Sequence, residues 1–95
     1  MEIVWTDNSK NTFYELVDYF GEYWEDKQYL NFKQRTLSLL DNISKNPKMF
    51  SEFKGDIRKA VLLEKISIFY RAKNDKIILI TFWHNKQSLN KLKLN

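Results

Sequence analysis

The sequence predicts an α+β fold in which a helical hairpin packs on one face of a mainly antiparallel four-stranded sheet. Three observations support this prediction. Apolar residues recur at helical spacing in two stretches of the first half. A short β-branched and aromatic segment precedes them, and three strand-like segments follow in the second half. The expected order is β-α-α-β-β-β, in a single domain over residues 1–95.

The first half of the chain contains the opening strand and the first helix. Residues 2–6, EIVWT, have the composition of a strand. Residues 6–9 can all cap a helix. The apolar residues that then follow helical spacing are Phe13, Leu16, Val17, Phe20 and Trp24. Gly21 weakens this pattern, so the first helix is expected to end near Tyr23.

A second apolar stripe predicts the second helix. Its face consists of Phe32, Thr36, Leu39, Leu40 and Ile43, and Leu37 widens it. The helix is expected to end before Asn46-Pro47, because the residue that precedes a proline is pushed out of the helical region. A short connection between two helices favours an antiparallel hairpin.

Three strands are predicted in the second half, after a loop at 49–56 that turns at Gly55. They cover 57–63, 65–72 and 77–83, and polar residues 73–76 connect the last two as a hairpin. Alternation divides the middle strand into one face with Ile66, Ile68 and Tyr70 and another with Ser67, Phe69 and Arg71. The last segment is almost wholly apolar, which predicts a strand that is central or covered on both faces.

Charge is divided unevenly between the two halves. Residues 1–47 contain five Lys or Arg and eight Asp or Glu, for a net charge of −3. Residues 48–95 contain eleven and four, for a net charge of +7. An acidic helical half joined to a basic sheet half indicates that the sheet half meets a polyanion. Residues 85–95 are expected to form a basic tail that is mobile or a short helix.

Composition excludes several kinds of site. The chain has no cysteine, so disulfides and thiolate metal sites are excluded, and no His and carboxylate set has the spacing of metal ligands. We therefore expect neither a metal nor a cofactor. No apolar run approaches the roughly 20 residues of a membrane span, and the N-terminal residues lack the pattern of a secretory signal. A cytoplasmic protein without a membrane partner is expected.

The order of elements and several local motifs resemble the RelE/ParE family of bacterial toxins from type II toxin–antitoxin systems. The matching parts are VWT at 4–6, the hairpin closing at Asn46-Pro47, Arg58, IFYR at 68–71 before the turn at 74–75, and WHNKQ at 83–87. The resemblance covers nearly the whole chain. It implies a growth-inhibiting toxin with a cognate antitoxin as partner, and it leaves a homodimer or a toxin–antitoxin hetero-oligomer open.

The resemblance leaves two targets open. RelE-like members cut messenger RNA on the ribosome, whereas ParE-like members lack that activity and inhibit DNA gyrase. Metal-free RNA cleavage needs a proton acceptor, a proton donor and cations that stabilise the charged phosphorane. For such an endoribonuclease the resemblance implies catalytic roles for Arg58, His84 and Lys86. The residues expected to bind RNA or another target are Lys54, Lys59, Arg71 and Gln87.

Two departures from the nuclease pattern keep other interpretations open. Ser67 stands where RelE-like nucleases commonly carry an arginine, and no tyrosine follows Tyr70. The chain could therefore be a non-catalytic gyrase inhibitor, or an inactive remnant that still binds its antitoxin. Arg58 could cap the sheet edge or pair with Glu64, and His84 could be an ordinary strand-end residue. If Arg58 lies in the site, Arg58→Ala is expected to reduce toxicity and leave the fold intact.

Overall fold

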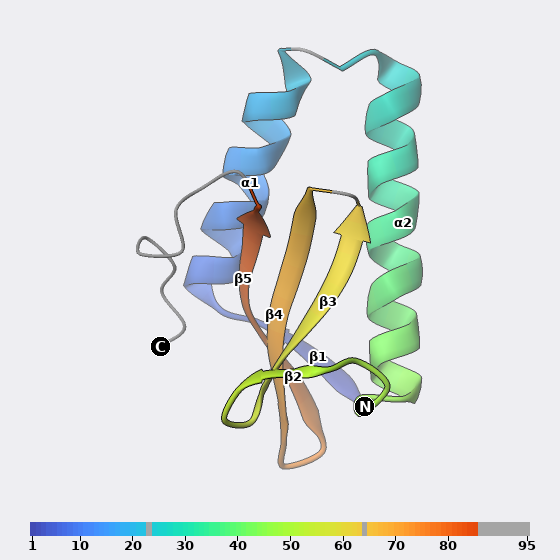
Figure 1. Ribbon diagram of the computed structural model, residues 1–95. Coiled ribbons are helices and arrows are strands. Elements are labelled where there is room, and N and C mark those ends of the chain that lie inside the picture. The colour runs from blue at the N-terminus through green and yellow to red at the C-terminus, as the bar shows by residue number, and fades with distance from the viewer. Residues whose placement is uncertain (23, 64, 86–95) are drawn as a thin grey trace.

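The computed structural model describes residues 1–22, 24–63 and 65–85. The elements in chain order are β1 (Glu2–Trp5), α1 (Asp7–Gly21), α2 (Asp26–Lys45), β2 (Glu52–Lys54), β3 (Ile57–Leu63), β4 (Ile66–Lys73) and β5 (Lys76–His84). The chain rises through α1, turns at the top of Figure 1 and descends through α2. The two helices therefore form the antiparallel hairpin that the sequence predicts.

The five strands form one mixed sheet in the order β1-β5-β4-β3-β2. β1 runs parallel to β5, and all other neighbours are antiparallel. The predicted α+β class and the order of helices and strands are confirmed. The sheet has one strand more than expected, because residues 52–54 of the expected loop form β2. Glu52 pairs with Arg58, and Gly55, with φ at 59°, provides the tight turn between the two strands.

Both faces of the sheet carry apolar side chains. The main core joins the helices to one face and contains Leu16, Phe32, Leu40, Ile43, Ala60, Leu62, Ile66, Ile68, Tyr70, Ile77, Leu79 and Phe82. A smaller cluster contains Ile57, Phe69, Ile80 and Trp83. The alternation predicted along β4 is confirmed, since Ile66, Ile68 and Tyr70 belong to the first cluster and Phe69 to the second. β5 lies between β1 and β4 and supplies both clusters, as its apolar composition predicts.

A bulge in β5 changes which of its side chains face the helices. Phe69 pairs with Thr81 but Tyr70 pairs with Leu79, so Ile80 is an extra residue in β5. Before the bulge, Leu79 faces the helices; after it, Phe82 does. Strict alternation would have turned Phe82 away from the helices.

Side chains at the start of α1 complete the hydrogen bonding of β5 where β1 ends. The Thr6 hydroxyl donates to the carbonyl oxygen of Leu79, at 2.7 Å, and the Asn8 amide donates to that of Ile80, at 3.0 Å. The Thr12 hydroxyl accepts a hydrogen bond from the Phe82 backbone N–H, at 3.0 Å. The polar residues after β1 therefore begin α1 and also provide hydrogen-bond partners for backbone groups of β5 beyond the end of β1.

The ends of the helices follow local sequence signals. Thr6 caps α1, which ends at Gly21, close to the predicted end. At the start of α2, Glu25 and Gln28 form a capping box. α2 ends before Asn46-Pro47, as predicted.

The β4–β5 connection is shorter than the four residues expected. The strands run to Lys73 and Lys76, and only Asn74 and Asp75 remain in the turn. Their φ angles are 54° and 60°, which is the left-handed pair that a type I′ hairpin turn requires. In the described part of the chain, no helix combines the length and apolarity that crossing a membrane requires.

Candidate functional site

Arg58 lies in β3 at the edge where β2 joins the sheet. Its guanidinium donates a hydrogen bond to the carbonyl oxygen of Phe50, at 2.6 Å, and a longer one to Oε1 of Glu52, at 3.4 Å. The contact with Glu52 is also an ion pair. Arg58 therefore fastens the segment before β2 to the sheet, which is the edge-capping role of the alternative interpretation. The other suggested partner, Glu64, lies outside the described residues.

Tyr70 lies opposite Arg58 in β4 and is fully buried. Its hydroxyl donates a hydrogen bond to the carbonyl oxygen of Pro47, at 2.6 Å. Burial raises the pKa of this hydroxyl, and the nearby Arg58 guanidinium lowers that pKa by a smaller amount. The hydroxyl thus ties Pro47, just beyond the end of α2, to the sheet.

This burial predicts an alkaline loss of stability. The unfolded chain loses the Tyr70 proton near pH 10.0, and the folded chain holds it to higher pH. The stabilising contribution is therefore complete below pH 10.0 and is lost as the pH rises through the folded pKa. Urea unfolding of the parent protein and of Tyr70→Phe, at pH values from below to above 10.0, measures this loss of stability. The decline should be smaller in Tyr70→Phe, and an equal decline in both proteins would contradict the prediction.

Three of the residues expected to bind a target lie on the neighbouring strands β2, β3 and β4, where Lys54 pairs with Ile57 and Ile57 pairs with Arg71. We call Lys54, Lys59, Arg71 and Phe53 the basic end. Phe53 is 41% exposed and packs edge-on against Phe69, with ring centroids 4.8 Å apart. The Lys59 ammonium lies 6.0 Å from the Phe53 centroid, within cation–π range. Arg71 forms an ion pair with Asp56 at 3.0 Å, so part of its charge is neutralised.

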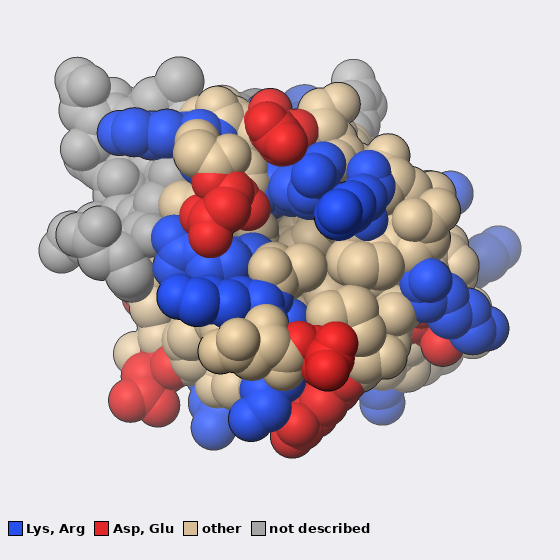
Figure 2. Space-filling model, turned by 90° about the horizontal axis from the view of Figure 1, so that it is seen from below, with Lys and Arg blue, Asp and Glu red and all other residues tan. Residues whose placement is uncertain are grey.

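The charge at this end is mixed. Figure 2, which views the molecule from below, shows several separate groups of Lys and Arg with acidic side chains between them. A uniform positive face, which non-specific binding of a nucleic acid requires, is absent from the described atoms in this view. The basic end is better suited to a partner with a matching pattern of charges.

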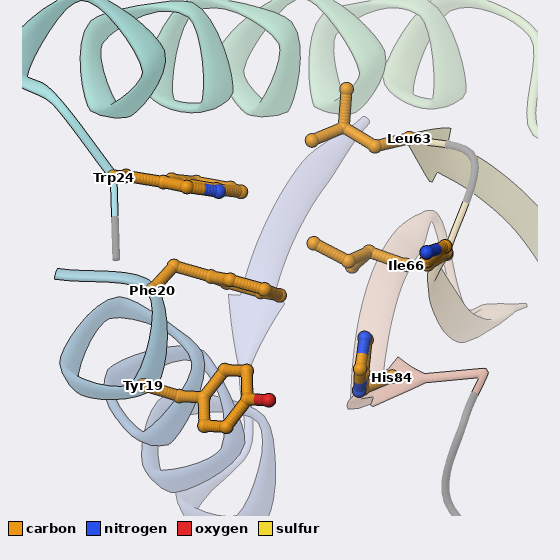
Figure 3. Close-up of a pocket in the computed structure, with 7 residues that line it drawn as sticks. Tyr19, Phe20, Trp24, Leu63, Ile66 and His84 are labelled. Atoms are coloured by element: carbon orange, nitrogen blue, oxygen red, sulfur yellow. The ribbon is translucent and has the colours of Figure 1, made fainter. Parts of the chain in front are cut away.

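His84 lies at the opposite end of the sheet, on the side of the helices. It pairs with Ile66, and its ring lies 5.5 Å from that of Phe20 and 5.9 Å from that of Tyr19. Figure 3 shows these side chains around a pocket of about 320 Å³. The pocket is lined by Tyr19, Phe20, Trp24, Leu63, Lys65, Ile66 and His84. His84 is therefore more than a strand-end residue, because it forms one wall of an aromatic pocket.

Arg58 and His84 do not converge on one point. Their partners in β4, Tyr70 and Ile66, are four residues apart, which corresponds to about 13 Å along a strand. They also stand on the two strands that flank β4 on opposite sides. With Arg58 bonded to Phe50, the two side chains cannot contact one phosphate group together. Lys86 and Gln87, the other proposed site residues, lie outside the described residues.

Ser67, which stands where RelE-like nucleases commonly carry an arginine, is buried inside the sheet. It is fully buried, pairs with Trp83 in β5, and its hydroxyl donates to Oδ1 of Asn85 at 3.3 Å. In the residues that the structure describes, no group of His, Cys, Asp and Glu could hold a metal ion.

A comparison with protein families agrees with the fold. A family model described as the ParE toxin of the type II toxin–antitoxin system parDE matches residues 3–89, which is almost the whole chain. The chain belongs to the ParE toxin family. A toxin of this family pairs with a cognate antitoxin. No curated protein gives a significant match to the chain.

In this ParE-family toxin, Phe53 was not predicted as a site residue, because residues 49–56 were expected to form a loop. Two signals were present: a three-residue alternation of charged and aromatic side chains, and a Gly-Asp pair before a strand. Tyr19 was overlooked as well, and no signal identifies it. Its position beside His84 depends on where α1 meets the end of β5.

Proposed function

We propose that this ParE-family toxin arrests growth by binding DNA gyrase, without catalysis. The observation that carries the proposal is the position of Arg58. Arg58, the cation expected to stabilise the phosphorane, is instead bonded to Phe50 and Glu52. It lies about 13 Å along the sheet from His84, the candidate for proton transfer. A nuclease needs these groups around one phosphate. An inhibitor that acts by binding does not.

The basic end is the surface that we propose for gyrase. It combines an exposed aromatic ring with cations, and aromatic residues and arginine are enriched at the energetic centres of protein interfaces. Lys54 is exposed, and Lys59 and Arg71 are partly exposed. Both gyrase and the ribosome are cytoplasmic, so the proposal includes a cytoplasmic location.

A DNA supercoiling assay tests this function. Purified toxin at micromolar concentration should inhibit gyrase, and Lys54→Glu with Lys59→Glu should weaken that inhibition about tenfold or more because it reverses two charges at the interface. A matched control reverses two exposed charges on α2, Lys27→Glu with Arg35→Glu, and should inhibit like the parent. Unchanged supercoiling at micromolar parent toxin would refute the proposal.

Ribosome-dependent cleavage of messenger RNA is the second candidate. His84 favours it, because an imidazole can accept or donate a proton near neutrality and this one lines a pocket with Lys65. Primer extension on messenger RNA after induction would then show cuts in codon register. Normal growth after induction without antitoxin would support neither function and would indicate an inactive remnant.

A further inference from the structure

The aromatic pocket beside His84 lies at the end of the sheet opposite the basic end. Three rings from the end of α1 and the helix connection form one side of it, Tyr19, Phe20 and Trp24. The ends of the strands form the other side, with Leu63, Ile66 and His84, as Figure 3 shows. The volume of about 320 Å³ is near the lower end of the range for small-molecule sites, about 300–1,000 Å³. One small ligand fits this volume, whereas a helix or strand of a protein does not.

The rings on the helix side are held in place without being fully buried. Phe20 and Trp24 stack with centroids 4.2 Å apart and 9° between the ring planes, and both are partly exposed. Tyr19 packs edge-on against Phe20 at 5.0 Å and is 54% exposed. Leu37, which was expected to widen the buried face of α2, is exposed as well, at 60%, but it lies outside this pocket. Fixed, accessible rings around a hollow offer a stacking surface for a planar ligand.

The sheet side of the pocket adds a fourth ring and a cation. His84 packs edge-on against Phe20, with centroids 5.5 Å apart. Lys65 lies in the connection between β3 and β4, and its carbonyl oxygen accepts a hydrogen bond from the Asn85 backbone N–H at 2.6 Å. This bond fastens the connection beside the end of β5. Among the described residues that line the pocket, Lys65 is the one with a permanent charge.

The surrounding charges set the orientation of an anionic ligand. Three exposed acidic residues stand on the helix side, in or next to the connection between the helices: Glu22, Glu25 and Asp26. They repel a phosphate from that side, and Lys65 attracts it to the other. A planar base would then lie against the rings of α1, with its phosphate toward the β3–β4 connection. Proteins stack bases on Phe, Tyr, Trp and His rings, and lysine is a common phosphate binder.

We propose that this pocket binds a free purine mononucleotide. The base stacks on Tyr19 and against the Phe20–Trp24 pair, and the Lys65 ammonium pairs with the phosphate. A purine is preferred to a pyrimidine, because its larger ring system covers more of the aromatic surface. The site is separate from the surface proposed for gyrase and does not depend on it.

Calorimetric titration of the purified toxin with adenosine monophosphate tests the site. Saturable binding is expected, with a Kd of about 1 mM or lower. Tyr19→Ala should weaken binding about tenfold, because it removes a stacking ring. Tyr14→Ala, which changes a 64% exposed tyrosine of the same helix, is the matched control and should bind like the parent.

The phosphate contact is tested with adenosine as a second probe. Lys65→Ala should weaken binding of adenosine monophosphate about fivefold, because it removes an exposed charge, and should leave binding of adenosine unchanged. Lys76→Ala, which changes an exposed lysine at the other end of β5, should alter neither affinity. Uridine monophosphate should bind more weakly than adenosine monophosphate.

Tryptophan fluorescence gives an independent readout of position. Trp24 lines the pocket, whereas Trp5 and Trp83 do not. Adenosine monophosphate should therefore quench the fluorescence of the parent with the calorimetric Kd. Trp24→Phe keeps a ring at this place, so it should retain the binding heat and lose the saturable quenching.

Four outcomes would overturn the proposal. They are the absence of saturable binding, equal affinities for adenosine and its monophosphate, unchanged binding by Tyr19→Ala, and binding of a short single-stranded RNA ten times tighter than that of the mononucleotide. The last outcome would assign the pocket to a nucleic-acid strand. Circular dichroism establishes that each variant is folded. Since these titrations contain no gyrase, their failure would leave the gyrase proposal standing, and failure of the supercoiling assay would leave the binding results unaffected.

Discussion

Replacing Phe32 with alanine is expected to lower the free energy of unfolding by about 3–5 kcal/mol, the usual cost of removing a fully buried aromatic ring. Phe32 is 1% exposed and stacks on Phe13 at a centroid distance of 5.8 Å. It also meets Trp24 edge-on at 5.5 Å. Phe32 thus joins α2 to α1 and to Trp24 in the connection between the two helices. Its removal leaves a cavity where the two helices meet the sheet.

This loss is a large fraction of the total free energy of unfolding of a small domain. A typical domain unfolds with about 5–15 kcal/mol, so Phe32→Ala should leave a visibly less stable protein. Urea unfolding measures the difference. Leu30→Ala, two residues earlier on an exposed face of α2, should change stability by only about 0.5 kcal/mol. A loss below about 1 kcal/mol for Phe32→Ala would show that the interior is not packed as described.

Arg58→Ala is expected to destabilise the protein by about 1.5–3 kcal/mol, the range for hydrogen bonds that involve a charged group. The substitution leaves the Phe50 carbonyl without the donor that it has at 2.6 Å and releases Glu52 from its ion pair. The segment that carries β2 should loosen first, because Arg58 is one of the side chains that hold it to the sheet. Hydrogen exchange of residues 50–54 would report that loosening.

The toxicity of Arg58→Ala separates the two roles of this residue. If Arg58 acts through the fold, toxicity should fall only as far as the amount of folded protein falls. Arg35→Ala, an exposed arginine on α2, serves as the control and should change neither property. A variant that keeps full stability but loses toxicity would contradict the structural role and would support the catalytic role that the family resemblance implies for Arg58.

Much of the fold follows from local patterns. The stripe from Phe32 to Ile43 predicts α2 and its buried face, and the proline at 47 predicts its end. Alternation along 66–71 predicts which side chains of β4 face the helices. These patterns succeed because each reflects a repeat of 3.6 or 2 residues that an amphipathic element must show.

The candidate site was harder to predict because its geometry depends on long-range contacts. The bulge at Ile80 changes the alternation along β5 and helps to place His84 on the side of the helices rather than on the opposite face of the sheet. Nothing in the apolar run of 77–83 marks that extra residue. The family resemblance implied that Arg58 is a functional cation, but its bonds depend on how residues 50–52 pack against the sheet.

We propose that this ParE-family toxin acts by binding gyrase, and a titration at two gyrase concentrations tests this function most directly. Tight binding requires the toxin concentration for half-inhibition of supercoiling to rise in proportion to the gyrase concentration, with messenger RNA on ribosomes uncut at the same doses. Cleaved messenger RNA at toxin concentrations far below those of the ribosomes, together with uninhibited gyrase, would contradict the claim.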